Sequence, residues 1–116
     1  EGEITFDQDS LSGKVDGNAA SGPLKKITTI DKLLGDARIT YLKADLEGYE
    51  MEMLKGAKTT IQRNRPKIAI TSYHTENVAT EIIREIKSYV PEYQYYVKGI
   101  FQEMGKPVMI HFWINE

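Results

Sequence analysis

The chain has 116 residues, a formal net charge of −2, 41% hydrophobic residues and no cysteine. This length and apolar content predict a single domain with one hydrophobic core. The nearly even charge argues against nucleic acid or an anionic membrane as a partner. The lack of cysteine excludes disulfides, zinc–thiolate sites and thiol nucleophiles, and favours an intracellular protein, which we expect to be cytoplasmic.

We expect neither a membrane-spanning helix nor a signal peptide in this sequence. No apolar run approaches the roughly 20 residues that a membrane-spanning helix needs, so we expect no membrane partner. The chain opens with EGEITFDQDS, which is acidic, whereas a signal peptide opens basic and then turns apolar. Because this opening lacks Met, we expect the chain to be a piece of a longer protein.

The first thirty residues predict strands around a loop. Residues 3–11 alternate apolar and polar side chains, and residues 24–30 are rich in β-branched residues, so both segments predict short strands. Residues 10–23, rich in Gly, Ser, Asn and Asp, predict a mobile loop. Asp31 then has the chemistry of a helix N-cap for a short turn that Gly35 ends.

Strands and helices alternate from residue 39 onward. In chain order, the patterns predict a strand (39–45), an amphipathic helix (49–63), a buried strand (67–73), a second amphipathic helix (77–89) and two strands (93–99 and 107–115). This order predicts an α/β fold with a parallel sheet and right-handed crossovers, to which the last two strands add an antiparallel edge. We expect Gly56, inside the first helix, to allow close packing on the sheet.

An acidic stretch, ADLEGYEME, follows the strand at residues 39–45. Ligands of open α/β sheets bind at the carboxyl ends of the strands, which is where Asp45 and Glu47 fall. If the extended backbone persists, their side chains point to the same side, and Gly48 then allows a sharp exit into the helix. This pair is therefore a candidate functional site. We interpret Glu50 and Glu52 as solvated residues whose negative charges interact favourably with the dipole of the helix.

A second candidate position is the carboxyl end of the next strand. His74 lies there and would serve as a general base, with Tyr73 beside it as a candidate substrate-binding residue. A surface histidine in a strand-to-helix loop is the plainer alternative. His111 lies in an apolar strand, and we expect it to be packed or to face an edge. For the aromatic residues of the last two strands, Tyr95, Tyr96, Phe112 and Trp113, we expect cross-strand packing.

The stretches TIDKL, YLKADLEGYEMEMLKGA and RPKIAI resemble the second half of FkbM-type methyltransferases. That family carries Lys-(apolar)-Asp-(apolar)-Glu-Gly-x-Glu followed by Leu-(Lys/Arg)-Gly-Ala. The matching residues are Lys43, Asp45, Glu47, Gly48, Glu50, Leu54, Lys55, Gly56 and Ala57. Asp31 matches an upstream acidic residue of the family, and the resemblance is densest over residues 28–70.

The resemblance implies an S-adenosylmethionine-dependent methyltransferase with a Rossmann-like sheet, acting on an oxygen of a sugar or secondary metabolite. In related enzymes the end of this strand faces the methyl group and the acceptor. Asp45 would then bind the acceptor hydroxyl or help to remove its proton. Glu47 and Gly48 would contribute to cofactor binding, with Glu47 orienting the charged amino end of the cofactor or the substrate. Ligation of a divalent ion by Asp45 and Glu47 is an alternative that we do not favour.

The departure from the family concerns the cofactor loop. The sequence contains no G-x-G-x-x-G after an apolar strand, and the first strands of the family fold are missing. We therefore interpret residues 1–116 as a single partial domain, the carboxy-terminal part of a methyltransferase. In it, residues 1–30 hold strands and a flexible loop, and residues 31–116 hold the α/β core. Alone, this fragment is expected to be inactive.

Two other functions stay open at this point. The chain could be a non-catalytic α/β binding or assembly module, which the missing cofactor loop favours. It could also be a metal-assisted hydrolase that uses Asp45, Glu47 and His74, although the sequence offers no nucleophile motif. The sequence does not identify the small-molecule or glycan acceptor.

The strand at residues 39–45 is expected to have an unpaired edge, because in the family it pairs with the first strand. Exposed edges are templates for other strands. We expect the amino-terminal strands to fold back over this edge, with homodimerisation through it as the alternative.

Overall fold

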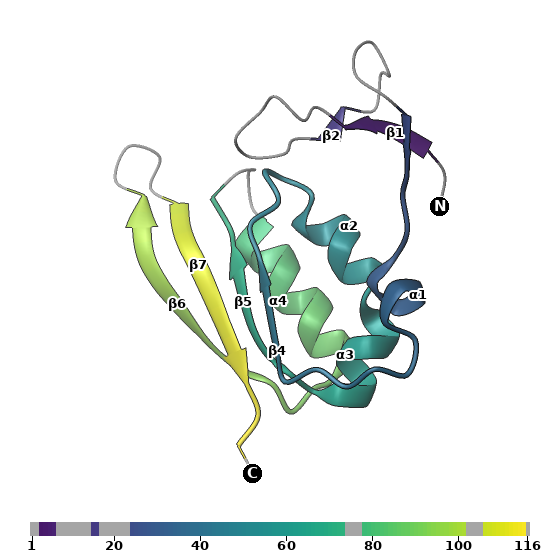
Figure 1. Ribbon diagram of the computed structural model, residues 1–116. Coiled ribbons are helices and arrows are strands. Elements are labelled where there is room, and N and C mark those ends of the chain that lie inside the picture. The colour runs from purple at the N-terminus through teal and green to yellow at the C-terminus, as the bar shows by residue number, and fades with distance from the viewer. Residues whose placement is uncertain (1–2, 7–14, 17–23, 74–77, 102–105, 116) are drawn as a thin grey trace.

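The computed structural model describes residues 3–6, 15–16, 24–73, 78–101 and 106–115. In this part of the chain, a four-stranded sheet carries its helices on one face, and a small three-stranded sheet lies apart from it (Figure 1). The strands are β1 (Glu3–Phe6), β2 (Val15–Asp16), β3 (Leu24–Lys26), β4 (Tyr41–Ala44), β5 (Lys67–Thr71), β6 (Gln94–Phe101) and β7 (Lys106–Trp113). The helices are α1 (Ile30–Leu34), α2 (Glu50–Lys55), α3 (Lys58–Asn64) and α4 (Val78–Tyr89).

The main sheet has the strand order β4-β5-β7-β6, which confirms the α/β class. Strands β4 and β5 pair in parallel, with Tyr41 opposite Lys67. Strand β7 is antiparallel to both of its neighbours, β5 and β6. The antiparallel pair lies at the end of the sheet, as expected, with β7 as its inner strand and β6 as its outer strand. The crossover through α4 leaves one strand position free between β5 and β6. The chain turns back after β6, and β7 occupies that position.

The hydrophobic core lies between this sheet and the helices. Alternate residues of the strands point toward α2, α3 and α4, as the two-residue period of a strand requires. The largest fully buried apolar side chains are Leu54, Ile61, Ile68, Ile70, Ile82, Ile86, Tyr93, Ile110 and Phe112. Two buried tyrosines also tie elements together. The hydroxyl of Tyr93 donates to the carbonyl of Pro66 (2.5 Å). The hydroxyl of Tyr89 lies 2.6 Å from the carboxylate of Glu85 and 3.2 Å from the carbonyl of Leu54.

The helix expected at residues 49–63 is in fact two helices, because the chain breaks at Gly56 and Ala57. Gly56 was expected to pack on the sheet, but it packs against Thr29 instead. A Cβ atom added at Gly56 would lie 3.0 Å from Cβ of Thr29. The backbone N–H of Asp31 also donates to the carbonyl of Gly56 (2.8 Å), which joins α1 to this break.

Asp31 caps a different helix from the one expected. The N-cap of α1 is Thr29, whose side chain accepts a hydrogen bond from the backbone N–H of Lys32. The carboxylate of Asp31 instead accepts from the backbone N–H groups of Thr60 (2.7 Å) and Thr59 (3.1 Å) in the first turn of α3. Burial acts to raise the pKa of Asp31, but these hydrogen bonds lower it overall. Asp31 therefore positions α3, whose own N-cap, Ala57, cannot cap it.

The amino-terminal strands do not cover the edge of β4, contrary to the expectation. They form their own sheet, in the order β2-β1-β3, and β4 remains an edge strand of the main sheet. Strand β2 lies within residues 10–23, which were expected to be loop, and the rest of that stretch falls outside the described residues. None of the described helices has the length and apolar character needed to cross a membrane.

Candidate functional site

The candidate site lies where β4 ends and the chain turns into α2. The backbone N–H of Tyr49 donates to the carbonyl of Leu46 (3.1 Å), which closes a tight turn. Its two central residues both have positive φ, 54° at Glu47 and 100° at Gly48, as in a type I′ turn. A glycine adopts this conformation freely, but Glu47 does so at a cost of about 1–2 kcal/mol. Backbone strain of this kind is found preferentially at functional sites.

Glu50 holds this turn from inside the protein. Its side chain is fully buried (0% exposed), which contradicts the expectation of a solvated helix-start residue; Glu52 is exposed as expected. The backbone N–H of Leu46 donates to Oε2 of Glu50 (2.5 Å), so the carboxylate reaches back over the turn. Its other oxygen, Oε1, is buried and has no hydrogen-bond partner among the described residues.

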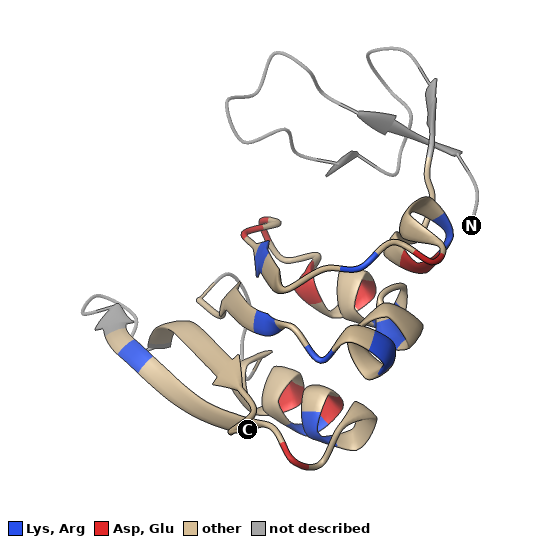
Figure 2. Ribbon diagram, turned by 60° about the horizontal axis from the view of Figure 1, so that its bottom comes forward, with Lys and Arg blue, Asp and Glu red and all other residues tan. Residues whose placement is uncertain are grey.

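Thr71 connects Glu50 to Asp45. The hydroxyl of Thr71, at the end of β5, lies 3.3 Å from Oε2 of Glu50 and 3.3 Å from Oδ1 of Asp45. Thr71 is itself buried, whereas Asp45 is exposed. The single O–H of Thr71 is therefore shared between two acceptors, the buried carboxylate of Glu50 and the surface carboxylate of Asp45. Figure 2 shows acidic residues gathered where β4 leads into α2.

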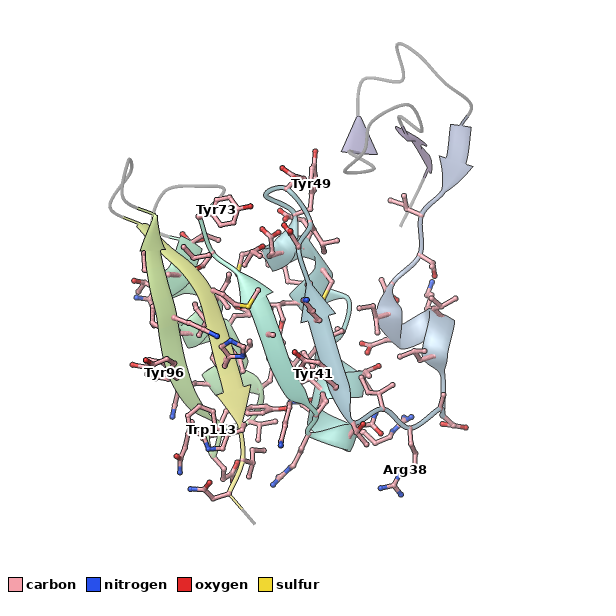
Figure 3. The ribbon with its side chains drawn as sticks, turned by 60° about the vertical axis from the view of Figure 1, so that its left-hand side comes forward. Arg38, Tyr41, Tyr49, Tyr73, Tyr96 and Trp113 are labelled. Carbon is pink, nitrogen blue, oxygen red and sulfur yellow. The ribbon has the colours of Figure 1, made fainter. Side chains whose placement is uncertain are left out.

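Tyr73 lies at the same end of the sheet. Figure 3 shows it close to the turn that carries Tyr49. Burial raises the pKa of Tyr73, and the negative charges of Asp45, Glu47 and Glu50 raise it further. The phenol thus stays neutral over a wider pH range, and a neutral phenol can donate a hydrogen bond to a ligand.

The structure brings four predicted residues, Asp45, Glu47, Gly48 and Tyr73, to one end of the sheet. The reason differs from the one expected for Asp45 and Glu47: β4 ends at Ala44, and the left-handed backbone of Glu47 breaks the alternation that would have aligned the two side chains. His74 lies outside the described residues.

The chemistry of this acceptor-rich end suits a cation or a hydroxyl group. Carboxylates accept hydrogen bonds and attract positive charge, and Tyr73 adds a neutral donor. Within the described residues, no three His, Cys, Asp or Glu side chains are arranged to hold a metal ion. The hydrolase alternative requires Asp45, Glu47 and His74 together, and His74 lies outside the described residues, so the structure does not test it.

Comparison with known protein families shows which family the chain belongs to. The family described as "Methyltransferase FkbM domain" matches residues 3–97. The chain belongs to the FkbM methyltransferase family.

A solved FkbM structure agrees with this assignment. The chain is similar to the crystal structure of the methyltransferase FkbM from Methylobacillus flagellatus KT, with 31% identity and a TM-score of 0.67. The match covers 78% of this chain but 24% of that one, so the chain spans about a quarter of the length of this relative. No curated protein matches the chain.

Two residues of the candidate site escaped the sequence reasoning, although one of them left a signal. Glu50 is the last acidic residue of the matching motif. Its place in the motif was a signal for a role beyond interaction with the helix dipole. The burial of Glu50 depends on the approach of α2 to β5, where Thr71 lies. The local sequence pattern does not reveal that approach. Thr71 looked like one more β-branched strand residue, and nothing in the sequence distinguishes its hydroxyl.

Proposed function

We propose that the protein containing this chain transfers a methyl group from S-adenosylmethionine to a hydroxyl oxygen of a sugar or secondary metabolite. This chain would form the acceptor side of that enzyme. The observation that carries the proposal is the turn after β4, where a buried Glu50 and Thr71 hold an exposed Asp45 beside a strained Glu47. FkbM family membership supplies the reaction class.

Each residue has a role that follows from its chemistry. Asp45 accepts the proton of the acceptor hydroxyl as the oxygen becomes a nucleophile, a contribution worth about 10²–10⁴-fold in rate. Thr71 orients the Asp45 carboxylate through its hydrogen bond. Tyr73 donates a hydrogen bond to the substrate, because its raised pKa keeps the phenol protonated. His74, which follows Tyr73 in the sequence, is a second candidate base.

The carboxylates also fit the cationic part of S-adenosylmethionine. When bound, this cofactor supplies an electrophilic methyl group on a positively charged sulfur. Glu47 is the residue that we assign to its charged amino end, and Gly48 gives the backbone room for a close approach. The fit is partial, because the Gly-rich turn that would hold the nucleotide is not in this sequence.

The test is methyl transfer by the whole protein encoded with this chain, measured with methyl-labelled S-adenosylmethionine and a panel of hydroxylated acceptors. We expect Asp45→Asn to lower kcat by about 10²–10⁴-fold while leaving the urea midpoint of unfolding unchanged. Glu52→Gln, an exposed change on α2, is the matched control and should leave kcat unchanged. If Asp45→Asn stays within a few-fold of the unmodified enzyme, Asp45 has no catalytic role.

A non-catalytic α/β binding or assembly module is the second candidate for the 116-residue chain taken alone. The absent Gly-rich turn favours it, because half a site loses most of its preorganised contacts. We expect this chain to bind S-adenosylmethionine weakly or not at all in calorimetric titration. A micromolar Kd would instead favour a complete cofactor site within these residues.

A further inference from the structure

Large apolar side chains are exposed at three places in the described part of the chain. The two outer strands of the main sheet, β4 and β6, carry Tyr41, Tyr95, Tyr96 and Val97. Leu33 is exposed on α1. Leu46 and Tyr49 are exposed on the turn that joins β4 to α2, next to the carboxylates of the candidate site.

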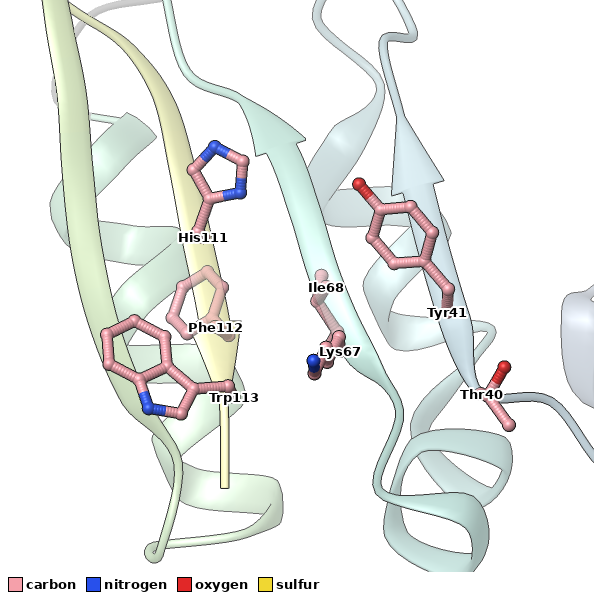
Figure 4. A pocket seen from close by; sticks show the side chains of 7 residues that line it. All are labelled: Thr40, Tyr41, Lys67, Ile68, His111, Phe112 and Trp113. Carbon is pink, nitrogen blue, oxygen red and sulfur yellow. The ribbon is translucent and has the colours of Figure 1, made fainter. Parts of the chain in front are cut away.

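The aromatic residues of the main sheet lie apart from that turn. Cross-strand packing was expected for those on the last two strands, and Tyr95 packs so against Phe112, with ring centroids 6.2 Å apart, whereas Tyr96 is 61% exposed. Figure 4 shows a groove of about 610 Å³, lined by residues at the start of β4 and β5 and near the end of β7. This groove is therefore at the opposite end of β4 from Asp45.

The turn places Leu46 and Tyr49 side by side. They are the first and last residues of a β-turn, whose Cα atoms lie within about 7 Å of each other. Leu46 is 39% exposed and Tyr49 is 40% exposed, although the buried Glu50 fixes the backbone between them and the sheet. Tyr49 is the N-cap of α2, but its side chain makes no capping hydrogen bond. The ring of Tyr49 is thus not needed to start the helix.

Hydrogen-bonding groups surround this apolar pair. Asp45 and Glu47 flank Leu46 in the sequence and are exposed, and Tyr73 lies with Tyr49 at the same end of the sheet (Figure 3). Such a surface suits a ring that has C–H bonds on its face and hydroxyl groups at its rim. The C–H bonds contact the negative face of an aromatic ring, and the hydroxyls donate to carboxylates. An open-chain polyol has the same hydroxyls without a rigid face, and it loses more conformational freedom when it binds.

We propose that Leu46 and Tyr49 determine which acceptor the site takes, by holding the C–H face of a ring while one hydroxyl of that ring reaches Asp45. This inference rests on the proposed methyl-transfer function, whose acceptor is the molecule that lies on the pair. Single exposed apolar residues are normal on protein surfaces. Here two of them adjoin each other on a strained turn, at the strand end where ligands of α/β sheets bind.

The first test measures methyl transfer by the whole encoded protein to a panel of pyranosides and to the corresponding open-chain alditols. We expect Tyr49→Ala to raise KM for the pyranosides about tenfold, with kcat within about twofold and KM for S-adenosylmethionine unchanged. KM for the open-chain acceptors should change by less than about twofold. Tyr49→Phe keeps the ring and should restore KM for the pyranosides. Leu33→Ala is the control for an exposed apolar residue away from the site. An unchanged KM for the pyranosides, or a raised KM for S-adenosylmethionine in its place, overturns the proposal.

The second test does not need methyl transfer, so it separates this inference from the proposed function. A pyranoside is titrated into the whole encoded protein without S-adenosylmethionine, and ¹³C-labelled leucine methyl groups are followed by NMR. We expect the methyl resonances of Leu46 to shift, those of Leu33 to stay in place, and Tyr49→Ala to weaken the shift. A shift of Leu46 in a protein that transfers no methyl group upholds this inference and contradicts the proposed function. A Leu46 signal that stays in place overturns the inference.

Discussion

Glu50 is a carboxylate placed where water cannot reach it. Burying such a group is costly unless hydrogen bonds replace its hydration. Here the backbone N–H of Leu46 and the hydroxyl of Thr71 meet one oxygen, while the other has no partner among the described residues. The compensation is therefore incomplete, and a protein that only needed a stable helix start would be better served by an exposed glutamate. The turn that Glu50 closes, with Asp45 and Glu47 on it, gives a reason for retaining the buried carboxylate.

Replacing Glu50 should reveal how strongly it holds the turn. Glu50→Leu leaves the part-buried Leu46 N–H without its acceptor, so we expect a loss of about 1–3 kcal/mol in the free energy of unfolding, measured with urea. Glu50→Gln retains an oxygen acceptor and should lose less. Glu52→Gln, which is exposed, should stay within about 0.5 kcal/mol. A Glu50→Leu variant as stable as the unmodified chain would mean that the hydrogen bond to Leu46 contributes nothing.

The pKa of Tyr73 reports on the negative charge at the site. Burial raises its pKa first, and the carboxylates add to the shift, so we expect its phenol to titrate above the ordinary value of about 10. Asp45→Asn removes one negative charge and should move the Tyr73 pKa back toward that value, with the effect of burial remaining. The ring Cζ resonance of Tyr73, followed by ¹³C NMR against pH, measures this directly. Glu52→Gln should leave the titration in place; if Asp45→Asn does so too, Tyr73 and Asp45 do not share one site.

At the scale of the elements, the junction of α1, α2 and α3 shows how distant contacts override local preference. The apolar spacing of residues 49–63 suits one continuous helix, and helix propensity alone would favour Ala at position 56. The break instead follows from the approach of Thr29 to Gly56 and from the capping of α3 by Asp31. Both contacts join residues far apart in the sequence, so the period of the pattern could not reveal them.

Gly56→Ala tests this junction, because two effects oppose each other there. Gly56 has a φ of −81° that Ala adopts without strain, so Ala favours folding by about 0.4–1 kcal/mol through the unfolded chain, whereas a Cβ 3.0 Å from Cβ of Thr29 forces overpacking that costs about 1–3 kcal/mol. We expect the clash to win and the urea midpoint to fall. Glycine is tolerated at an N-cap, so Thr29→Gly removes the clash while α1 can still form. In that background Gly56→Ala should become stabilising, and a double-mutant cycle without coupling would exclude the contact.

At the scale of the whole molecule, the α/β order, the parallel β4–β5 pair and the carboxylates after β4 could all be predicted from sequence. They rest on periodicity and on the rule that ligands bind at strand ends, both of which are local or general. The insertion of β7 between β5 and β6, the burial of Glu50 and the separate β2-β1-β3 sheet could not be predicted. Each depends on which surfaces meet in three dimensions, and several arrangements satisfy the same hydrophobic pattern.

The separate amino-terminal sheet leaves β4 as an edge, and we propose that two copies of the chain pair along it. The backbone N–H of Lys67 donates to the carbonyl of Thr40, so the neighbouring Tyr41 and Lys43 direct their backbone groups away from β5. Such an edge is a template for another strand.

We expect the amides of Tyr41 and Lys43 to exchange quickly with deuterium in dilute solution and to become protected as the protein concentration rises. Over the same concentration range, sedimentation should show a dimer. The amide of Leu42, which faces β5, is the internal control and should be protected throughout. Fast exchange of Tyr41 and Lys43 in a chain that stays monomeric at high concentration would contradict pairing. Slow exchange in a dilute monomer would mean that another part of the same chain covers the edge.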